Sequence, residues 1–363
     1  MRKAVVAMSG GVDSSVAAAL LVERGYDVTG IMLKLWRGET ANNNSGCCNL
    51  GAAEDARRVA DVLGIPFYVL NFAEHFEDTV VRNFHEDYSA GRTPNPCVRC
   101  NQWVKFGALL ERAEVLGADV LATGHYARVR GTERDGFRLL RGRDANKDQS
   151  YVLWMLGQRE LARTLFPVGE MEKAETRRIA EELGLRTARK PDSQEICFVR
   201  DGDLAGYVTE NIPGASVPGP LVDTGGNVVG EHGGVARYTI GQRKGLRVSL
   251  GRPVFVTSID AERNTVVVGD RGDLAVGAMD VMELRFVSQA PAPGTRVHVQ
   301  HRAHGEVNEG NLTADAHGAR IEFDRPVEAI APGQSAAFYS ATDPDELLGG
   351  GVISATVPAA VPA

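Results

Sequence analysis

The chain has 363 residues, of which 43% are hydrophobic and 24% charged, a composition typical of a soluble globular protein with two or three domains. No apolar run reaches the roughly 18 residues of a membrane-spanning helix, and glycine comes too early for a signal peptide, so we expect a cytoplasmic protein without a membrane partner. In a reducing compartment, its five cysteines indicate catalytic or metal-binding roles rather than a disulfide framework.

The net charge of −7 is unevenly distributed. Residues 1–200 hold 28 Lys and Arg against 27 Asp and Glu, whereas residues 201–363 hold 12 against 20. This balance argues against a nucleic-acid partner, but two local basic clusters argue for one. Each cluster fits either a solvated loop or a phosphate contact; the clusters are Arg128, Arg130, Arg134, Arg138, Arg141, Arg143 and Lys147, and Arg186, Arg189 and Lys190.

The first two hundred residues alternate apolar runs with helical patterns. The runs predict strands over 3–8, 27–36, 66–72 and 119–125, and the patterns predict helices from about Asp13 to Gly25, over 52–64 and over 106–117. Strands and helices in alternation predict an α/β fold with a parallel sheet and helices on both faces. Ligands of such sheets bind beyond the carboxyl ends of the strands.

The pattern changes after about residue 200. Residues 211–245 contain three prolines and nine glycines, which predicts short strands and turns. From about residue 276, apolar and polar residues alternate over 296–302, 319–325, 334–340 and 350–357, which predicts a small antiparallel sheet or barrel. We therefore predict a catalytic α/β domain over 1–200, an adaptor over 201–275 and a β-barrel over 276–363.

The strongest local signal is MSGGVDSSVAAALL, residues 8–21. An apolar strand enters Ser9-Gly10-Gly11, and a helix begins directly afterwards. The glycines admit an anion close to the backbone, and the helix start offers N–H groups and the positive end of its dipole. Because neither a Walker A lysine nor the dinucleotide fingerprint is present, we predict a pyrophosphate cradle of another kind. The alternative is a glycine turn with Asp13 or Ser14 as an ordinary N-cap.

SGGVDSS resembles the motif of the PP-loop ATP pyrophosphatases, which adenylate a substrate oxygen. The wider chain resembles the tRNA-specific 2-thiouridylase family, which places sulfur at C2 of the wobble uridine in certain tRNAs. The stretches that carry this resemblance are GRTPNPCVRCNQWVKF (91–106), ATGHYAR (122–128), NKDQSYVLW (146–154), KPDSQEICFV (190–199), YTIGQRKGL (238–246) and PGQSAAFY (332–339). They span almost the whole chain, and the resemblance implies a PP-loop domain, an adaptor and a C-terminal β-barrel.

The resemblance also implies roles for individual residues. Cys197 would carry a persulfide, and Cys100 would attack it and form a transient disulfide. ATP would contact Ala7, Met8, Ser9, Gly10, Gly11, Val12, Asp13, Ser14, Leu33 and Gly124. The target base and the tRNA would contact Asn95, Pro96, Cys97, His125, Lys147, Asp148, Gln149, Arg302 and Gln334. His125 has an alternative role as a capping or core histidine. Arg302 is the weakest of these assignments, because Ala303 stands where the family often has an aromatic residue.

The chemistry of thiolation agrees with these residue types. The uridine oxygen must first become a leaving group, which its attack on the α-phosphate of ATP achieves. A persulfide then attacks the carbon, and a second thiolate breaks the S–S bond. The expected cofactors are ATP and Mg²⁺, because the polyphosphate charge needs a cation. The expected partners are tRNA, with the Lys, Glu and Gln isoacceptors implied, and a cysteine desulfurase or sulfur-relay protein.

Cys97 departs from the family, which often has aspartate there as a general acid or base. One interpretation keeps the Cys100–Cys197 relay and makes Cys97 a substitute or helper thiol. Another makes Cys97, Cys100 and Cys197 the ligands of a [4Fe–4S] cluster with one open iron. A zinc site needs a fourth ligand, His125 or Cys48. Cys48 and its neighbour Cys47 follow ANNNSG and are expected to be passengers on a loop.

Two other functions compete with tRNA thiolation. The first is a PP-loop enzyme that acts on a small metabolite, which would cleave ATP without RNA and without Cys100 or Cys197. The second is a non-catalytic protein that binds nucleotide and RNA or metal, which would bind tightly and release no AMP. The two cysteine segments, far apart in the sequence, together with the KDQS motif, favour thiolation over both.

Overall fold

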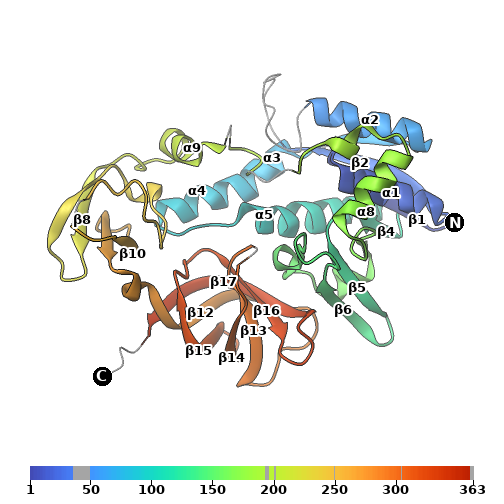
Figure 1. Ribbon diagram of the computed structural model, residues 1–363. Coiled ribbons are helices and arrows are strands. Elements are labelled where there is room, and N and C mark those ends of the chain that lie inside the picture. The colour runs from blue at the N-terminus through green and yellow to red at the C-terminus, as the bar shows by residue number, and fades with distance from the viewer. Residues whose placement is uncertain (36–49, 193–195, 200–201, 249, 304, 360–363) are drawn as a thin grey trace.

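The structure is a computed structural model that describes residues 1–35, 50–192, 196–199, 202–248, 250–303 and 305–359 (Figure 1). Cys47, Cys48 and Trp36 lie outside the described residues. None of the helices in the described part of the chain is long and apolar enough to cross a membrane.

A five-stranded parallel sheet forms the centre of the N-terminal half, as predicted. Its order is β3-β2-β1-β4-β7, with β1 (Lys3–Ala7), β2 (Asp27–Lys34), β3 (Phe67–Asn71), β4 (Val120–Ala122) and β7 (Thr164–Leu165). Successive side chains of a strand enter different hydrophobic clusters: Val5 joins one, and Val6 joins the other. Both faces of the sheet are therefore covered, which confirms the predicted α/β class.

Helices cover the two faces in separate groups. One face packs against α1 (Val12–Glu23), α2 (Leu50–Leu63) and α8 (Lys173–Glu182). The other packs against α3 (Ala73–Phe76), α4 (Arg82–Ser89), α5 (Pro96–Arg99) and α6 (Leu110–Val115), joined by π-helical segments Glu77–Val81 and Cys100–Leu109. The helix predicted over 106–117 therefore belongs to a longer helical run that begins at Pro96. The Asn95 side chain caps that start by accepting from Val98 N at 3.3 Å, and proline suits the first helical position.

The middle of the chain forms a small four-stranded sheet, consistent with the predicted short strands and turns. Its order is β10-β11-β8-β9, with β8 (Gly219–Asp223), β9 (Val228–His232), β10 (Phe255–Asp260) and β11 (Thr265–Gly269). Helix α9 (Leu204–Asn211) precedes it. Leu221, Val256 and Val266 lie in a hydrophobic cluster of this region alone.

The C-terminal region is an antiparallel barrel, as predicted. Its sheet runs β12-β15-β14-β13-β16-β17 and closes through pairing of β12 with β17. The strands are β12 (Ala275–Phe286), β13 (Thr295–Gln300), β14 (Asn308–Ala314), β15 (Ala319–Glu328), β16 (Ser335–Ser340) and β17 (Glu346–Pro358).

A hairpin from the N-terminal half extends this barrel sheet. Strands β5 (Ala127–Thr132) and β6 (Gly136–Arg141) pair with each other, and β6 pairs with β17 through Leu139 and Leu140. The first basic cluster, interpreted as a solvated loop or a phosphate contact, is thus largely a β-hairpin with a short helix, α7 (Gln158–Ala162), beside it. The loop interpretation is wrong over 127–141 because Leu139 and Leu140 are buried at the joint with the barrel.

Candidate active site

The predicted pyrophosphate cradle begins with Ser9 to Ser14, called the phosphate loop below, which lies at the carboxyl end of β1. Gly10 has φ +71°, and a Cβ there would come 2.3 Å from the carbonyl oxygen of Ala52. Ser14 Oγ lies 3.1 Å from Ser9 N and 3.2 Å from Gly11 O, accepting from the former and donating to the latter. Helix α1 has Gly11 as its N-cap and no side-chain cap. Its start is therefore open to an anion, and the ordinary N-cap interpretation of Asp13 or Ser14 is wrong.

A chain of charges connects this loop to the segment that precedes Cys197. Lys173 Nζ donates to both carboxylate oxygens of Asp13, at 2.7 and 2.8 Å, and pairs with Asp192 at 2.8 Å. Asp192 also pairs with Lys147 at 2.8 Å and Arg177 at 2.9 Å. Burial alone would raise the pKa of Asp192, but the hydrogen bonds from Lys147 and Lys173 outweigh burial and lower it. Asp192 is thus a carboxylate that collects three cations beside the loop.

The end of β4 packs directly on the start of α1. A Cβ at Gly124 would lie 2.6 Å from Ser14 N and 2.7 Å from the Asp13 carbonyl carbon, so only glycine fits. The next residue, His125, is buried between the rings of Phe106 and Phe166, each 5.9 Å away, and its Nδ1 lies 2.7 Å from Thr123 Oγ1. Burial lowers the pKa of His125 well below its ordinary value. The structure places His125 in the core, the alternative considered for it.

The cysteine pair lies on and just after α5. Cys97 is exposed, and Cys100, one turn later, is buried. Cys197 is half-buried at the margin of the same large hydrophobic cluster that contains Cys100. Its neighbour Phe198 is inserted among the rings of Phe76 and Phe84, at 5.9 and 5.0 Å. This insertion anchors the Cys197 segment over α3 and α4.

The described arrangement does not gather the three cysteines into a metal site. Across the described residues, which include Cys97, Cys100, Cys197 and His125, no group of three or more His, Cys, Asp or Glu could hold a metal ion. Among the described residues these donors therefore form neither the cluster site nor a zinc site with His125, and the zinc alternative with Cys48 lies outside the described residues.

The KDQ segment makes its contacts within the chain. Asp148 accepts from Arg141 at 2.7 Å, from Gly142 N at 2.9 Å and from the Ser150 backbone and hydroxyl. Gln149 Oε1 accepts from Tyr126 N at 3.0 Å. These two side chains fix the turn after β6. The third residue of the segment, Lys147, pairs with Asp192, which in turn pairs with Lys173 beside the phosphate loop.

The two predicted tRNA contacts of the barrel also have partners. Gln334 Nε2 donates to Thr93 O at 2.9 Å, and Arg302 donates to Ala329 O. Among the residues predicted to contact ATP, Leu33 is buried on β2, and Met8 is buried at the end of β1. The loop and Gly124 are thus in direct contact, and Lys147 is linked to the loop through Asp192 and Lys173, whereas Arg302 lies in the barrel region.

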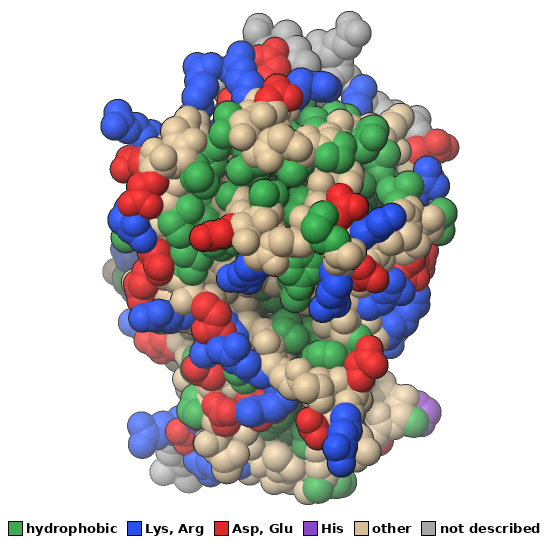
Figure 2. Space-filling model, turned by 90° about the vertical axis from the view of Figure 1, so that its right-hand side faces the viewer, with side chains coloured by type: hydrophobic (Ala, Val, Ile, Leu, Met, Phe, Trp, Pro, Cys, Tyr) green, Lys and Arg blue, Asp and Glu red, His purple; other side chains and the backbone are tan. Residues whose placement is uncertain are grey.

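The first basic cluster is largely neutralised by acidic residues. Arg128 pairs with Asp345, Arg138 with Glu346 at 2.8 Å, and Arg130 with Glu170. Figure 2, which faces the side of the molecule with α1 and β5–β6, shows basic and acidic side chains interspersed rather than a single basic field. A hollow of about 370 Å³ remains between Arg128, Arg141 and Arg143, bordered by Asp148 and Asp345.

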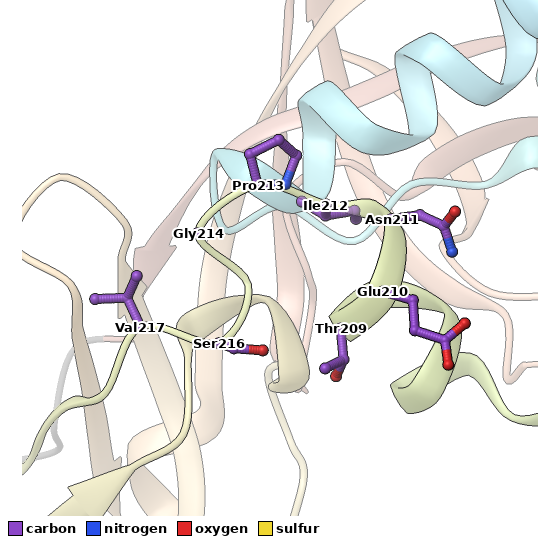
Figure 3. Close-up of a pocket in the computed structure, with 8 residues that line it drawn as sticks. All are labelled: Thr209, Glu210, Asn211, Ile212, Pro213, Gly214, Ser216 and Val217. Atoms are coloured by element: carbon purple, nitrogen blue, oxygen red, sulfur yellow. The ribbon is translucent and has the colours of Figure 1, made fainter.

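Another hollow, of about 450 Å³, lies after α9 in the adaptor (Figure 3). One continuous segment, residues 209–217, lines it, and its single charged side chain is Glu210. The hydroxyl residues Thr209 and Ser216 line it, but no cysteine, lysine or arginine does.

Comparison with known proteins identifies the family. Three family models match in chain order: "tRNA methyl transferase HUP domain" over residues 2–201, "tRNA methyl transferase PRC-barrel domain" over 206–270 and "Aminomethyltransferase beta-barrel domain" over 276–353. A tRNA-specific 2-thiouridylase of Symbiobacterium thermophilum is 48% identical, covering 98% of this chain and 93% of its own. The chain belongs to the tRNA-specific 2-thiouridylase family. A second 2-thiouridylase, from Moorella thermoacetica, is also 48% identical, covering 96% of this chain and 98% of its own.

Among solved structures, a 4-thiouridine synthetase–RNA complex with bound ATP covers 58% of this chain and 50% of its own, with a TM-score of 0.37 and 17% identity. That likeness is too low to support an argument. The 2-thiouridylase assignment rests on the sequence relatives.

Some residues of the candidate 2-thiouridylase site were not predicted. Lys173 and Tyr126, whose hydroxyl donates to Asp13 at 2.8 Å, hold the loop carboxylate. Asp192 and Tyr126 lie inside stretches that carry the family resemblance, which was a usable signal. Lys173 lies in no such stretch, and only the fold brings it to the loop.

Proposed function

We propose that the protein is an ATP-dependent tRNA-uridine 2-sulfurtransferase that converts the wobble uridine to 2-thiouridine and releases AMP and pyrophosphate. The observation that carries this proposal is 48% identity over nearly the full length to curated 2-thiouridylases. An open helix start behind a glycine loop at the carboxyl edge of a parallel sheet supports the ATP half of the reaction. The cysteines of two separate segments support the sulfur half.

In the first step, the uridine O2 attacks the α-phosphorus of ATP, and pyrophosphate leaves toward the N–H groups at the start of α1. Lys173 pairs with Asp13 of the phosphate loop, and Lys147 pairs with Asp192, the other carboxylate that Lys173 contacts; both cations would offset the charge of the polyphosphate. Since no three-ligand group for a metal exists among the described residues, we infer that Mg²⁺ arrives on ATP rather than in a preformed protein site.

In the second step, the terminal sulfur of a Cys197 persulfide attacks C2, and AMP leaves with the former O2. The Cys100 thiolate then attacks the Cys197 sulfur. This step forms the Cys100–Cys197 disulfide and releases the new thiocarbonyl sulfur with the electron pair of the broken S–S bond. A dithiol reductant regenerates both thiols, and a cysteine desulfurase or sulfur-relay protein reloads Cys197. In this scheme Cys97, exposed on α5, faces the target base.

The test is a thiolation assay with anaerobically purified protein. The mixture contains ATP, Mg²⁺, a cysteine desulfurase, cysteine, a dithiol and an unmodified tRNA-Glu transcript, and the RNA is resolved on a mercury-affinity gel. Iron and acid-labile sulfide are measured in the same preparation. We expect an ATP-dependent shifted band without iron, lost in Cys100→Ser and Cys197→Ser and retained at least in part in Cys97→Ser.

Each other outcome supports a different mechanism or function. A shift that follows the iron content and disappears in Cys97→Ser supports the [4Fe–4S] alternative. The absence of a shift with a loaded donor refutes the tRNA assignment. AMP release driven by a metabolite would then support a PP-loop synthetase, and tight nucleotide binding without AMP release would support a non-catalytic binding protein.

A further inference from the structure

The C-terminal barrel holds the cysteine helix at its start. Thr93 N donates to Pro332 O at 2.8 Å, and Gln334 Nε2 donates to the carbonyl oxygens of Thr93 and Pro94, at 2.9 and 3.3 Å. Gly333 has φ +91°, and a Cβ there would lie 2.8 Å from Thr93 N. The two segments are therefore in backbone contact immediately before α5.

The barrel also holds the end of the helix, through Arg99. The Arg99 side chain, only 7% exposed, makes a two-pronged pair with Glu283: Nη1–Oε2 and Nη2–Oε1 are both 2.7 Å. Its guanidinium lies 4.7 Å from the centroid of the Trp103 ring, and Nη1 also donates to Gln102. Because the guanidinium is planar and makes two parallel bonds, the pair fixes both the orientation of Arg99 relative to Glu283 and the distance between them. Arg99 directly precedes Cys100.

Glu283 adopts a conformation that is unusual for its residue type. It lies on β12 with φ +53°, where pairing with β17 changes register between Met282 and Arg285. A non-glycine residue there costs about 1 kcal/mol, and bulges of this kind turn a side chain in a new direction. This bulge directs the Glu283 carboxylate at the helix that carries the cysteines (Figure 1 shows α5 over the barrel).

We propose that Arg99 and Glu283 are positioning residues for sulfur transfer: the barrel, through this pair, holds Cys97 and Cys100 where the thiolate must attack. The inference rests on the proposed function. Arg99 and Glu283 bond to each other, and Arg99 also contacts Gln102 and Trp103; none of these residues belongs to the phosphate loop, so adenylation and sulfur transfer should respond differently to loss of the pair. A displacement of about 1 Å at a reacting group can lower a rate by about 100-fold.

The experiment compares Glu283→Gln, Arg99→Gln and the double variant with the wild type. We expect each single variant to lower the single-turnover thiolation rate at least about tenfold, with the ATP dissociation constant within about twofold of the wild type. Because the two side chains act through each other, the double variant should be no slower than the slower single variant. Arg138→Gln is the matched control, since Arg138 on β6 also pairs with a barrel carboxylate, Glu346, but is 46% exposed and does not lie on the cysteine helix. It should retain the wild-type rate within about twofold.

Thermal melting of every variant accompanies the rates. Wild-type rates in Glu283→Gln and Arg99→Gln overturn the inference, and so do additive losses in the double variant or a loss that Arg138→Gln shares. A parallel loss of ATP affinity or of folding overturns it too, because the pair would then be merely structural. If the wild-type protein thiolates no tRNA, the proposed function itself is refuted. The wild-type reaction alone distinguishes this outcome from a failure of the positioning inference.

Discussion

At the scale of the residue, Lys173 neutralises the carboxylate of the phosphate loop. Its ammonium group lies between Asp13 and Asp192, and its removal would leave the loop carboxylate facing an incoming polyphosphate. Since hydrogen bonds between charged groups contribute about 1.5–3 kcal/mol, we expect Lys173→Met to raise the KM for ATP at least about tenfold. Arg177→Gln is the control, because Arg177 pairs with Asp192 but not with Asp13. AMP release at varied ATP concentration measures both, and equal KM values in the two variants would contradict the prediction.

The same residues show what the sequence alone could predict. Ser9 to Ser14 form a continuous motif, so their common place at the end of β1 followed from local rules. Lys173 is 160 positions from Asp13, and Glu283 is 184 positions from Arg99. Both are ordinary charged residues that only the packing of α8 and the bulge in β12 bring to their partners.

At the scale of the element, the contact between β4 and α1 depends on Gly124. An added methyl group would meet the backbone of Asp13 and Ser14, so α1 or the end of β4 must shift. We expect Gly124→Ala to lower the melting temperature by several degrees and to raise the ATP dissociation constant at least about tenfold. Gly272→Ala, with nothing within 4 Å of the added carbon, should change neither by a measurable amount. An unchanged ATP affinity in Gly124→Ala would show that the helix start is not the phosphate site.

Elements with regular patterns were predicted, and those that depend on distant partners were not. Strands β1 to β4 of the parallel sheet and β13, β15, β16 and β17 of the barrel agree with their apolar runs and alternation, whereas β7, β12 and β14 were not predicted. The β5–β6 hairpin was missed because its arginines suggested solvent, whereas Asp345 and Glu346 of the barrel neutralise Arg128 and Arg138. The early start of α5 was missed because Pro-Asn-Pro resembles a turn, whereas Asn95 and Pro96 cap a helix here.

At the scale of the whole molecule, the barrel and the catalytic half share one hydrophobic cluster. Cys100, Tyr151 and Trp154 belong to it together with Tyr339 and Val352 of the barrel. The Tyr151 hydroxyl donates to Ser335 O at 3.0 Å, and Ser150 and Tyr339 hydroxyls lie 2.9 Å apart. Because this interface is buried and hydrogen-bonded, we expect the two regions to unfold in one transition rather than two, a result that calorimetry can contradict by resolving two peaks.

Acid should weaken this fold between pH 6.5 and 5. His85, His125, His232 and His301 all have a lowered pKa because burial disfavours their charged forms, and that of His301 falls to about 4. Below pH 6.5 the unfolded chain binds protons that the folded chain does not, so stability is full above that pH and decreases toward the folded pKa. For His301, whose folded pKa is about 4, the decrease is on the order of 1 kcal/mol per pH unit, and carboxylates with a lowered pKa, such as Asp192, lose their stabilising effect only at lower pH. Denaturant unfolding at several pH values measures this decrease in the free energy of unfolding.

His301→Gln should make the free energy of unfolding less dependent on pH, whereas His317→Gln, at an exposed position, should not change that dependence. A free energy of unfolding that is constant from pH 7.5 to 5 would contradict the burial of these histidines.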